Sequence, residues 1–240
     1  MDIINKLKSA IDIKKILKLL GILLIFFLSG DVKVIVANVL NYDVNNLTPD
    51  QLFTLTAITD AILVIVLCLI YLKDLRKDFK LMKKDFNKNT EVGFKYWIVG
   101  LIVMIVSNLI INIFLKDATA TNEEVVQEII GAAGFVSVIV IGIVGPIIEE
   151  LVFRKAFRDA IKNKIAFVLI SGVIFGGLHV ILSISSPFDL FYLIPYCSLG
   201  ISFGIMYVKT DNIYTSMFMH VFHNTVFTLI SLVGTGAILW

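Results

Sequence analysis

The sequence predicts an all-α protein that crosses a membrane several times as a bundle of helices. Hydrophobic residues make up 58% of the 240 residues, whereas soluble domains contain about 45–50%, and the mean hydropathy is +0.92. The apolar residues form seven stretches of the length that a spanning helix needs, about 20 residues. Basic residues recur in alternate loops, so composition, stretch length and charge together predict a polytopic transmembrane bundle of about seven spans.

The predicted spans cover residues 16–40, 52–72, 94–115, 126–148, 165–184, 190–208 and 212–234. Asp31 and Lys33 interrupt the first span, and one interpretation is that it ends at about Ser29 and continues along the interface. Basic and apolar positions alternate over residues 1–15, which is typical of an amphipathic helix that lies on the membrane surface.

The loops on the two sides of this bundle differ in charge. Lysine and arginine gather in residues 73–88 and 154–164, whereas residues 41–50 carry none and residues 116–127 are mainly acidic and polar. Positive loops favour the cytoplasm, so we expect the N-terminus inside and the C-terminus outside. Because the basic residues flank spans and form no compact face, they indicate membrane lipid, not nucleic acid, as a partner.

Apolar residue types and spacings inside the spans indicate packing. Cys68 and Cys197 lie in apolar runs and are interpreted as core residues, not as a disulfide or a metal pair. Two glycine pairs, at 172/176 and 200/204, are spaced by four, which allows neighbouring backbones to approach closely. We divide the chain into residues 1–124, with three spans and the basic loop, and residues 125–240, with the polar residues described next.

Two adjacent carboxylates, Glu149 and Glu150, follow the apolar run 131–148. A charge at the centre of a membrane helix costs roughly 2.5–3.5 kcal/mol on insertion scales, so such a pair needs a partner or a task. In a helix Glu150 and Arg154 share a face and can pair, whereas Glu149 points about 100° away. We interpret Glu150 as held by arginine and Glu149 as the freer group. A charge cluster at a helix end is the alternative.

All three histidines, His179, His220 and His223, lie in predicted spans. Phe175 precedes His179 by one turn and can flank its imidazole, and Asn224 shares a helix face with His220. A carboxylate and an imidazole can together activate a water molecule as a general base. Histidine and asparagine donors can bind a developing oxyanion. These residue types therefore favour acyl-bond hydrolysis.

Three segments resemble the motifs of the CPBP family of CAAX prenyl endopeptidases and bacteriocin-processing or Abi-type intramembrane proteases. They are EExxxR at 149–154, FxxxH at 175–179 and HxxxN at 220–224, in this order and on separate spans. The resemblance covers about residues 125–235 and implies hydrolysis of a peptide bond inside the membrane. It implies water activation by Glu149 and His179, oxyanion stabilisation by His220 and Asn224, and ordering of the site by Glu150 and Arg154. Phe175 is a candidate substrate contact, whereas His223 lies outside the motif.

Zinc is the alternative to a metal-free reaction. One glutamate and two histidines can bind zinc, but the chain has no HExxH motif and the residues come from three different spans. The resemblance also implies a metal-free glutamate mechanism, so we predict no cofactor.

The depths of the site residues constrain the fold. Counted from the basic ends at 1.5 Å per residue, Glu149 lies shallower than His220 and His179. They meet only if the fourth span continues to about Ala160, which we predict. We also predict a conical site open to the cytoplasmic half, with Arg154 and Arg158 lining a wet cavity or reaching the cytoplasm.

Two other functions fit the same residues. One is a binding protein on this fold, such as a bacteriocin immunity factor or membrane scaffold. The other is a transporter, against which stands the lack of an inverted repeat. We expect a multi-pass protein of a bacterial cell membrane that acts on a membrane-associated peptide or protein. The sequence specifies neither the identity of this substrate nor the oligomeric state of the protein.

Overall fold

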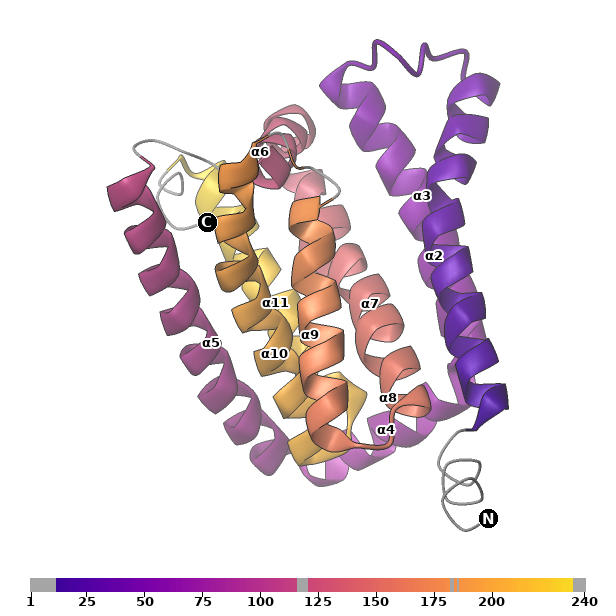
Figure 1. Cartoon of the computed structure of the whole chain (residues 1–240). Helices are drawn as coiled ribbons and strands as arrows, with labels where there is room; N and C mark the ends of the chain where they lie inside the picture. Colours follow the sequence, from indigo (N-terminus) through magenta and orange to yellow (C-terminus); the bar gives the residue numbers. More distant parts are fainter. Residues whose placement is uncertain (1–11, 116–120, 182–183, 185, 235–240) are drawn as a thin grey trace, which may run out of the picture.

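The computed structural model describes residues 12–115, 121–181, 184 and 186–234. Every regular element in these ranges is helical, which confirms the all-α class (Figure 1). The elements are α2 (Ile13–Val39), α3 (Pro49–Ile70), α4 (Leu72–Lys84), α5 (Phe86–Phe114), α6 (Thr121–Ala133), η1 (Gly134–Val136), η2 (Val138–Val144), α7 (Gly145–Glu149), η3 (Glu150–Ala156), α8 (Phe157–Ala160), α9 (Lys164–Ile181), η4 (Pro187–Tyr192), α10 (Leu193–Thr210) and α11 (Ile213–Leu232). The surface helix predicted over residues 1–15 lies largely outside the described residues.

Five helical segments are long and apolar enough to cross a membrane, and six if the bent pair described below counts as one span. The helix α11 is the seventh predicted span. It is present as a helix of 20 residues, but its two histidines and its asparagine lower its mean hydropathy. Asp31 and Lys33 do not end the first span, because α2 runs unbroken from Ile13 to Val39. The Lys33 ammonium instead donates a hydrogen bond to the Thr56 hydroxyl on α3, at 3.1 Å.

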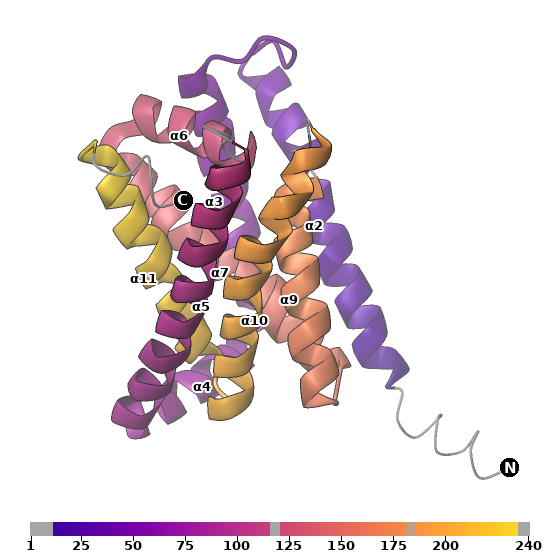
Figure 2. The same ribbon diagram turned by 60° about the vertical axis from the view of Figure 1, so that its left-hand side comes forward.

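The bounds predicted for the fourth span, 126–148, are wrong. The chain bends by 109° between Glu123–Val136 and Val138–Ala160, next to Gly134, whose φ of +55° is a conformation that glycine adopts readily. As a result α6 lies across one end of the bundle (Figure 2). The helix that follows runs on to Ala160, and this confirms the continuation that the site residues require.

The helices α9 and α10 pack backbone against backbone. A Cβ atom added at Gly176 would lie 2.6 Å from the Cys197 backbone nitrogen, and one added at Gly200 would lie 2.7 Å from the Gly172 carbonyl oxygen. Such distances leave no room for a side chain, so the close approach that the glycine spacing predicted is confirmed at these positions.

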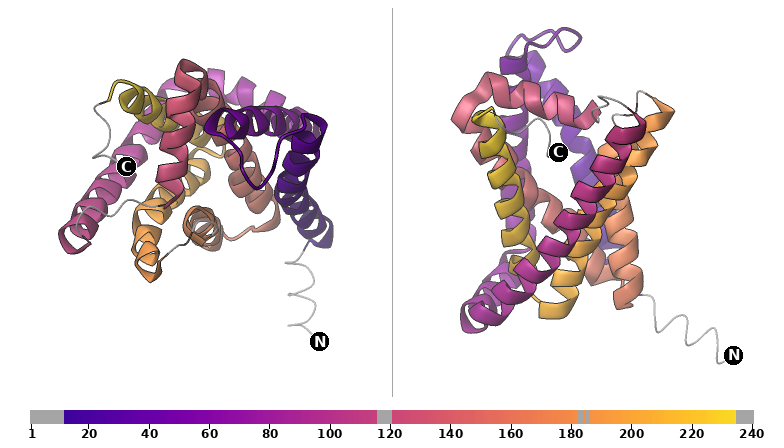
Figure 3. Two further views of the ribbon diagram at one scale, coloured as in Figure 1. Left: turned by 90° about the horizontal axis from the view of Figure 1, so that it is seen from above. Right: turned by 90° about the vertical axis from the view of Figure 1, so that its left-hand side faces the viewer.

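The two ends of the bundle differ. The basic helix α4 lies across the end opposite α6 (Figure 1) and is tied to α11 by the Asn212 amide, which donates to the Asp78 carbonyl oxygen at 2.7 Å. Helices α5 and α11 lie close together near α4 and separate toward α6 (Figure 3). The space between the helices is therefore widest at the end that α6 covers.

Candidate active site

The glutamate pair lies in a helix that changes its hydrogen-bonding pattern twice. The five α-helical residues of α7 lie between two π-helical segments, η2 and η3. Pro146 in α7 has no backbone N–H to donate, so it cannot continue a regular ladder. Such π turns are frequent at functional sites because they change which side chains face the interior. Here they leave Glu149 at the junction of α7 and η3.

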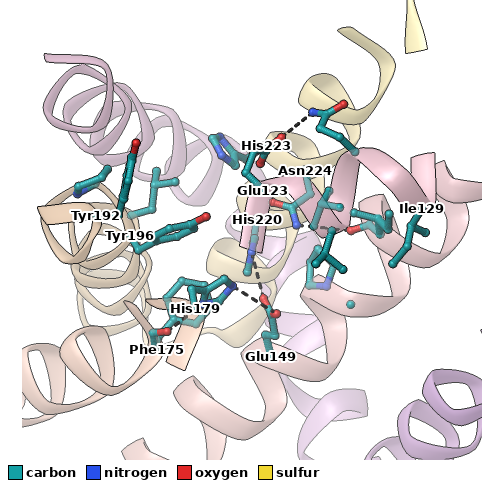
Figure 4. Close-up of a pocket in the computed structure, with 18 of the residues that line it drawn as sticks. Glu123, Ile129, Glu149, Phe175, His179, Tyr192, Tyr196, His220, His223 and Asn224 are labelled. Atoms are coloured by element: carbon teal, nitrogen blue, oxygen red, sulfur yellow. Dashed lines mark hydrogen bonds and ion pairs between the residues drawn. The ribbon is translucent and has the colours of Figure 1, made fainter. Parts of the chain in front are cut away.

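Glu149 faces two histidines from two other helices. The His179 Nε2 atom on α9 lies 3.8 Å from Glu149 Oε1, and the His220 Nε2 atom on α11 lies 3.4 Å from Glu149 Oε2. Figure 4 shows the three side chains pointing toward one another. The structure therefore brings together the residues that the sequence predicted would meet.

The tautomer of His179 follows from its second contact. Its Nδ1 atom lies 2.8 Å from the Phe175 carbonyl oxygen. Because a carbonyl oxygen only accepts, Nδ1 carries the hydrogen and donates it. In the neutral ring Nε2 is then an acceptor, and it faces Glu149. The His179 ring also stacks on Tyr196, with centroids 5.0 Å apart, and this contact fixes the ring plane.

His220 connects the two glutamates. Its Nδ1 atom lies 3.1 Å from Glu150 Oε1, on the side of the ring away from Glu149. The carboxylate accepts this hydrogen bond and so directs Nε2 toward Glu149. Phe203 stacks on the imidazole with a centroid distance of 4.5 Å.

Glu150 and Arg154 form the ion pair that their spacing predicted. Arg154 Nε lies 3.5 Å from Glu150 Oε1, and both side chains are fully buried. Arg154 Nη1 donates to the Ser171 carbonyl oxygen at 3.3 Å, and the guanidinium lies over the Phe175 ring at 4.7 Å. One arginine thus links the glutamate helix to α9.

The predicted environment is wrong for Arg154, whereas Arg158 is partly exposed and lines a polar cavity at the basic end of the bundle. Arg154 neither lines a wet cavity nor reaches an end of the bundle, because the turn that carries it is buried on all sides. Arg158 Nη1 donates to the carbonyl oxygens of Ile161 and Lys162, at 3.0 and 3.1 Å, and so satisfies carbonyls just beyond the end of α8. The spacing of the residues could not reveal which face of the helix the neighbours cover.

The remaining predicted residues lie around the same centre. Asn224 donates from Nδ2 to the Ile141 carbonyl oxygen in η2, at 3.4 Å, and lines the cavity beside His220 (Figure 4). Phe175 also lines the cavity and is 4% exposed. His223, which the sequence left without a role, accepts at Nδ1 from the Trp97 indole N–H at 3.3 Å.

A cavity of about 660 Å³ adjoins Glu149. It extends toward α6 and is lined there by Lys33, near the end of α2, and by Leu52 and Thr56, at the start of α3. The prediction of a site open toward the basic end is therefore wrong, because this cavity lies on the opposite side of Glu149. Counting residues from the basic ends gave relative depths but not the side on which the helices separate.

The cavity is also lined by residues to which the sequence analysis assigned no role. Asp60 and Lys33 are charged residues within apolar stretches of the sequence, yet only the structure brings them to one cavity with Glu123. Tyr196 and Phe203, which stack on the two histidines, carry no sequence signal, since aromatic residues in apolar helices are common core residues.

The arrangement of Glu149, His179 and His220 also bears on the zinc alternative. Among the residues that the structure describes, no group of three or more histidine, cysteine, aspartate or glutamate side chains is arranged to hold a metal ion. The two histidine nitrogens face different oxygens of Glu149, at 3.8 and 3.4 Å. Two ligands of one tetrahedral zinc ion lie roughly 3.4 Å from each other, so these separations do not decide between a metal and a water molecule. Cys68 and Cys197 are free thiols. Whether the reaction needs a metal stays a prediction.

Comparisons with known proteins agree with these motifs. Residues 131–226 match the family model of the type II CAAX prenyl endopeptidase Rce1-like proteins. The chain is 35% identical over 114 residues to the "Putative membrane peptidase YdiL" of Bacillus subtilis, a match that covers 46% of this chain and 43% of that protein. It is 26% identical over 143 residues to the "UPF0177 protein YxdF" of Lactococcus lactis, which covers 57% of this chain and 77% of that protein.

The search of the solved structures found no match. The match to YdiL spans less than half of that protein, so the activity of the whole relative is not carried over to this chain. The resemblance to CPBP proteases is nevertheless confirmed by the family model and by the two relatives. The similarity to the Rce1-like, CAAX-type intramembrane proteases lies in residues 131–226, the part of the chain that carries the three motifs.

Proposed function

We propose that the protein is a glutamate-type intramembrane endopeptidase that hydrolyses a peptide bond of a membrane-associated peptide or protein. The observation that carries the proposal is Glu149, held between His179 and His220 at the wall of a cavity. The family match supports a protease in general. The roles proposed for the individual residues are supported by this geometry and by the resemblance of the three motifs.

Glu149 and His179 are proposed to activate the attacking water. The neutral His179 tautomer turns a lone pair toward Glu149, so two acceptors face each other across 3.8 Å. A water molecule bound beside them can donate one hydrogen to each, which orients its oxygen toward the substrate. Its oxygen attacks the carbonyl carbon while one of its protons passes to Glu149.

His220 and Asn224 are proposed to stabilise the tetrahedral intermediate. Glu150 fixes Nδ1 of His220, and with both ring nitrogens protonated His220 can donate from Nε2 to the oxyanion. The charges of Glu149, Glu150, Arg154 and His220 then sum to zero, which lowers the cost of holding them inside an apolar bundle. Asn224 donates a further hydrogen from its amide.

Collapse of the intermediate completes the reaction. The carbon–nitrogen bond breaks, and the proton held by Glu149 passes to the leaving nitrogen, so that the products are a carboxylic acid and an amine. The substrate and one water molecule supply every atom of these products. We propose that the protein's own side chains carry out these steps without a metal or a cofactor.

The proposed orientation places the basic helix α4 in the cytoplasm. The part of the cavity that α6 lines then lies in the outer half of the membrane. The peptide bond would be reached from that side, which suits an exported or membrane-anchored peptide.

The test is cleavage of membrane-anchored peptides by the purified protein, compared with Glu149→Ala and His179→Ala. We expect both variants to lose cleavage while they remain folded. Wild-type rates in both variants would rule out the proposed chemistry. Bacteriocin immunity that persists in Glu149→Ala would instead favour a binding role on this fold.

A further inference from the structure

The cavity contains carboxylates that peptide-bond hydrolysis does not use. Asp60 on α3 and Glu123 and Glu124 on α6 line it in addition to Glu149, and Lys33 is the one lysine or arginine among its described lining residues. We call the part lined by Asp60, Asn108, Glu123 and Glu124 the acidic chamber. Its side chains give it an excess of negative charge.

Glu123 is the most buried of these carboxylates. The residue is 6% exposed, and it accepts a hydrogen bond from the Gln127 amide, which also donates to the Ser231 hydroxyl on α11 at 3.0 Å. No described lysine, arginine or histidine forms an ion pair with it. A buried carboxylate held by a neutral amide alone is costly, and a cation brought beside it offsets that cost.

Lys33 does not neutralise the chamber through a direct ion pair. Its ammonium donates to the Thr56 hydroxyl at 3.1 Å, and no ion pair joins it to the Asp60 carboxylate among the described residues. Asp60 lies one turn along α3 from the hydroxyl that Lys33 uses, so the Lys33 charge acts on its carboxylate through space and offsets part of the negative charge of the chamber.

Among the described residues, a buried amide on α5 also lacks a hydrogen-bond donor on the cavity side. Asn108 lines the same cavity and is 5% exposed, and its side-chain oxygen has no hydrogen-bond partner in the described part of the chain. Buried amide oxygens are normally satisfied. A lysine ammonium offers three donor hydrogens and an arginine guanidinium five, so either group can satisfy the amide and a carboxylate together.

The chamber lies within reach of the proposed catalytic groups. Figure 4 shows Glu123 on the far side of His220 and Asn224 from Glu149. A peptide chain whose carbonyl lies beside His220 and Asn224 would therefore extend a neighbouring side chain toward Glu123.

We propose that the acidic chamber is a subsite for a lysine or arginine side chain of the substrate, close in sequence to the cleaved bond. The preferred substrates are then basic peptides. The assignment of the bond rests on the proposed endopeptidase function, whereas the binding of a cationic side chain does not.

The experiment measures binding separately from cleavage. The full chain is placed in phosphatidylcholine nanodiscs, which carry no net charge. Fluorescent apolar peptides carry lysine, norleucine or glutamate at a single position, and this position is moved along the peptide from one set to the next. Binding of each peptide is measured by fluorescence anisotropy. Glu149→Gln is used as background so that no peptide is consumed. At one position of the peptide we expect the lysine peptide to bind about tenfold more tightly than the norleucine peptide, a difference of about 1.4 kcal/mol in binding free energy. The glutamate peptide should bind more weakly than both.

Variants then assign the preference to the chamber. Glu123→Gln and Asp60→Asn should each reduce the lysine preference, whereas Glu128→Gln should keep it, because Glu128 is on α6 but exposed and outside the cavity. Unfolding curves establish that each variant is folded. Equal binding of the three peptides, no binding of any, or a preference that survives both chamber variants would overturn the subsite.

Cleavage by the protein with Glu149 intact is recorded in parallel. A lysine preference in binding without cleavage keeps the subsite and rejects the endopeptidase function. Cleavage without any dependence on lysine keeps the function and rejects the subsite.

Discussion

The two adjacent glutamates have opposite environments. The side chain of Glu149 is 24% exposed at the cavity wall, whereas that of Glu150 is fully buried between Arg154 and His220. One step along the helix thus separates a group that can meet a substrate from a group that can only hold its neighbours. Within the EExxxR motif, the first glutamate therefore faces the cavity, whereas the second pairs with Arg154 and His220 in the packed interior.

The largest effect should come from Glu149. We expect Glu149→Gln to lower the cleavage rate by about 10²–10⁴-fold, the usual contribution of a general base, with little change in stability because the carboxylate faces a cavity. The measurement is the rate of peptide cleavage beside an unfolding curve. Glu128→Gln, on an exposed surface of α6, is the matched control, and an equal loss there would contradict a role specific to Glu149.

The opposite pattern is expected at Glu150. Glu150→Gln leaves the Arg154 charge buried without a carboxylate, and breaking such a pair costs about 3–5 kcal/mol. Chemical unfolding in detergent measures this loss. The double variant Glu150→Leu with Arg154→Met removes both charges and should recover much of the stability. A single variant as stable as the unchanged protein would show that the pair does not hold the site together.

A smaller effect is expected where α9 meets α10, which positions His179. Gly176→Ala places a methyl group 2.6 Å from the Cys197 backbone, and we expect a loss of about 1–3 kcal/mol. Gly177→Ala is the control on the same turn, because the atom nearest to its new methyl group is 3.8 Å away. The control should be neutral or slightly stabilising, since alanine favours helix. Equal losses would mean that the contact is not tight.

No effect is expected from metal removal. If Glu149 and His179 activate water without a metal, dialysis against a strong chelator should leave the cleavage rate unchanged. Loss of activity that returns on addition of zinc would assign Glu149 to metal binding and would remove its proposed role as the base.

The sequence predicted the parts of the site that depend on helical spacing. The Glu150–Arg154 pair and the shared face of His220 and Asn224 follow from four-residue separations, and the family motifs indicated which helices meet. The bend beside Gly134 could not be predicted, because the apolar run continues through it and a glycine in such a run usually serves packing.

The direction of the cavity could not be predicted either. Basic loops indicate which helix ends lie together, but where the bundle separates depends on the crossing of α5 and α11, which neither helix encodes alone. The acidic chamber escaped notice for a similar reason. Asp60 and Glu123 are far apart in the chain, and they reach one cavity only because α6 lies across the bundle.

The π-helical turns on either side of α7 have a consequence for comparing distant relatives. Each widened turn accommodates a surplus residue within one turn of a helix, so a chain that lacks this residue can form a regular α turn there and keep the face that follows. A homologue with a single-residue gap in Val138–Val144 can then still present its glutamate on the face that Glu149 occupies. Alignments of such chains should therefore allow a one-residue gap before the motif.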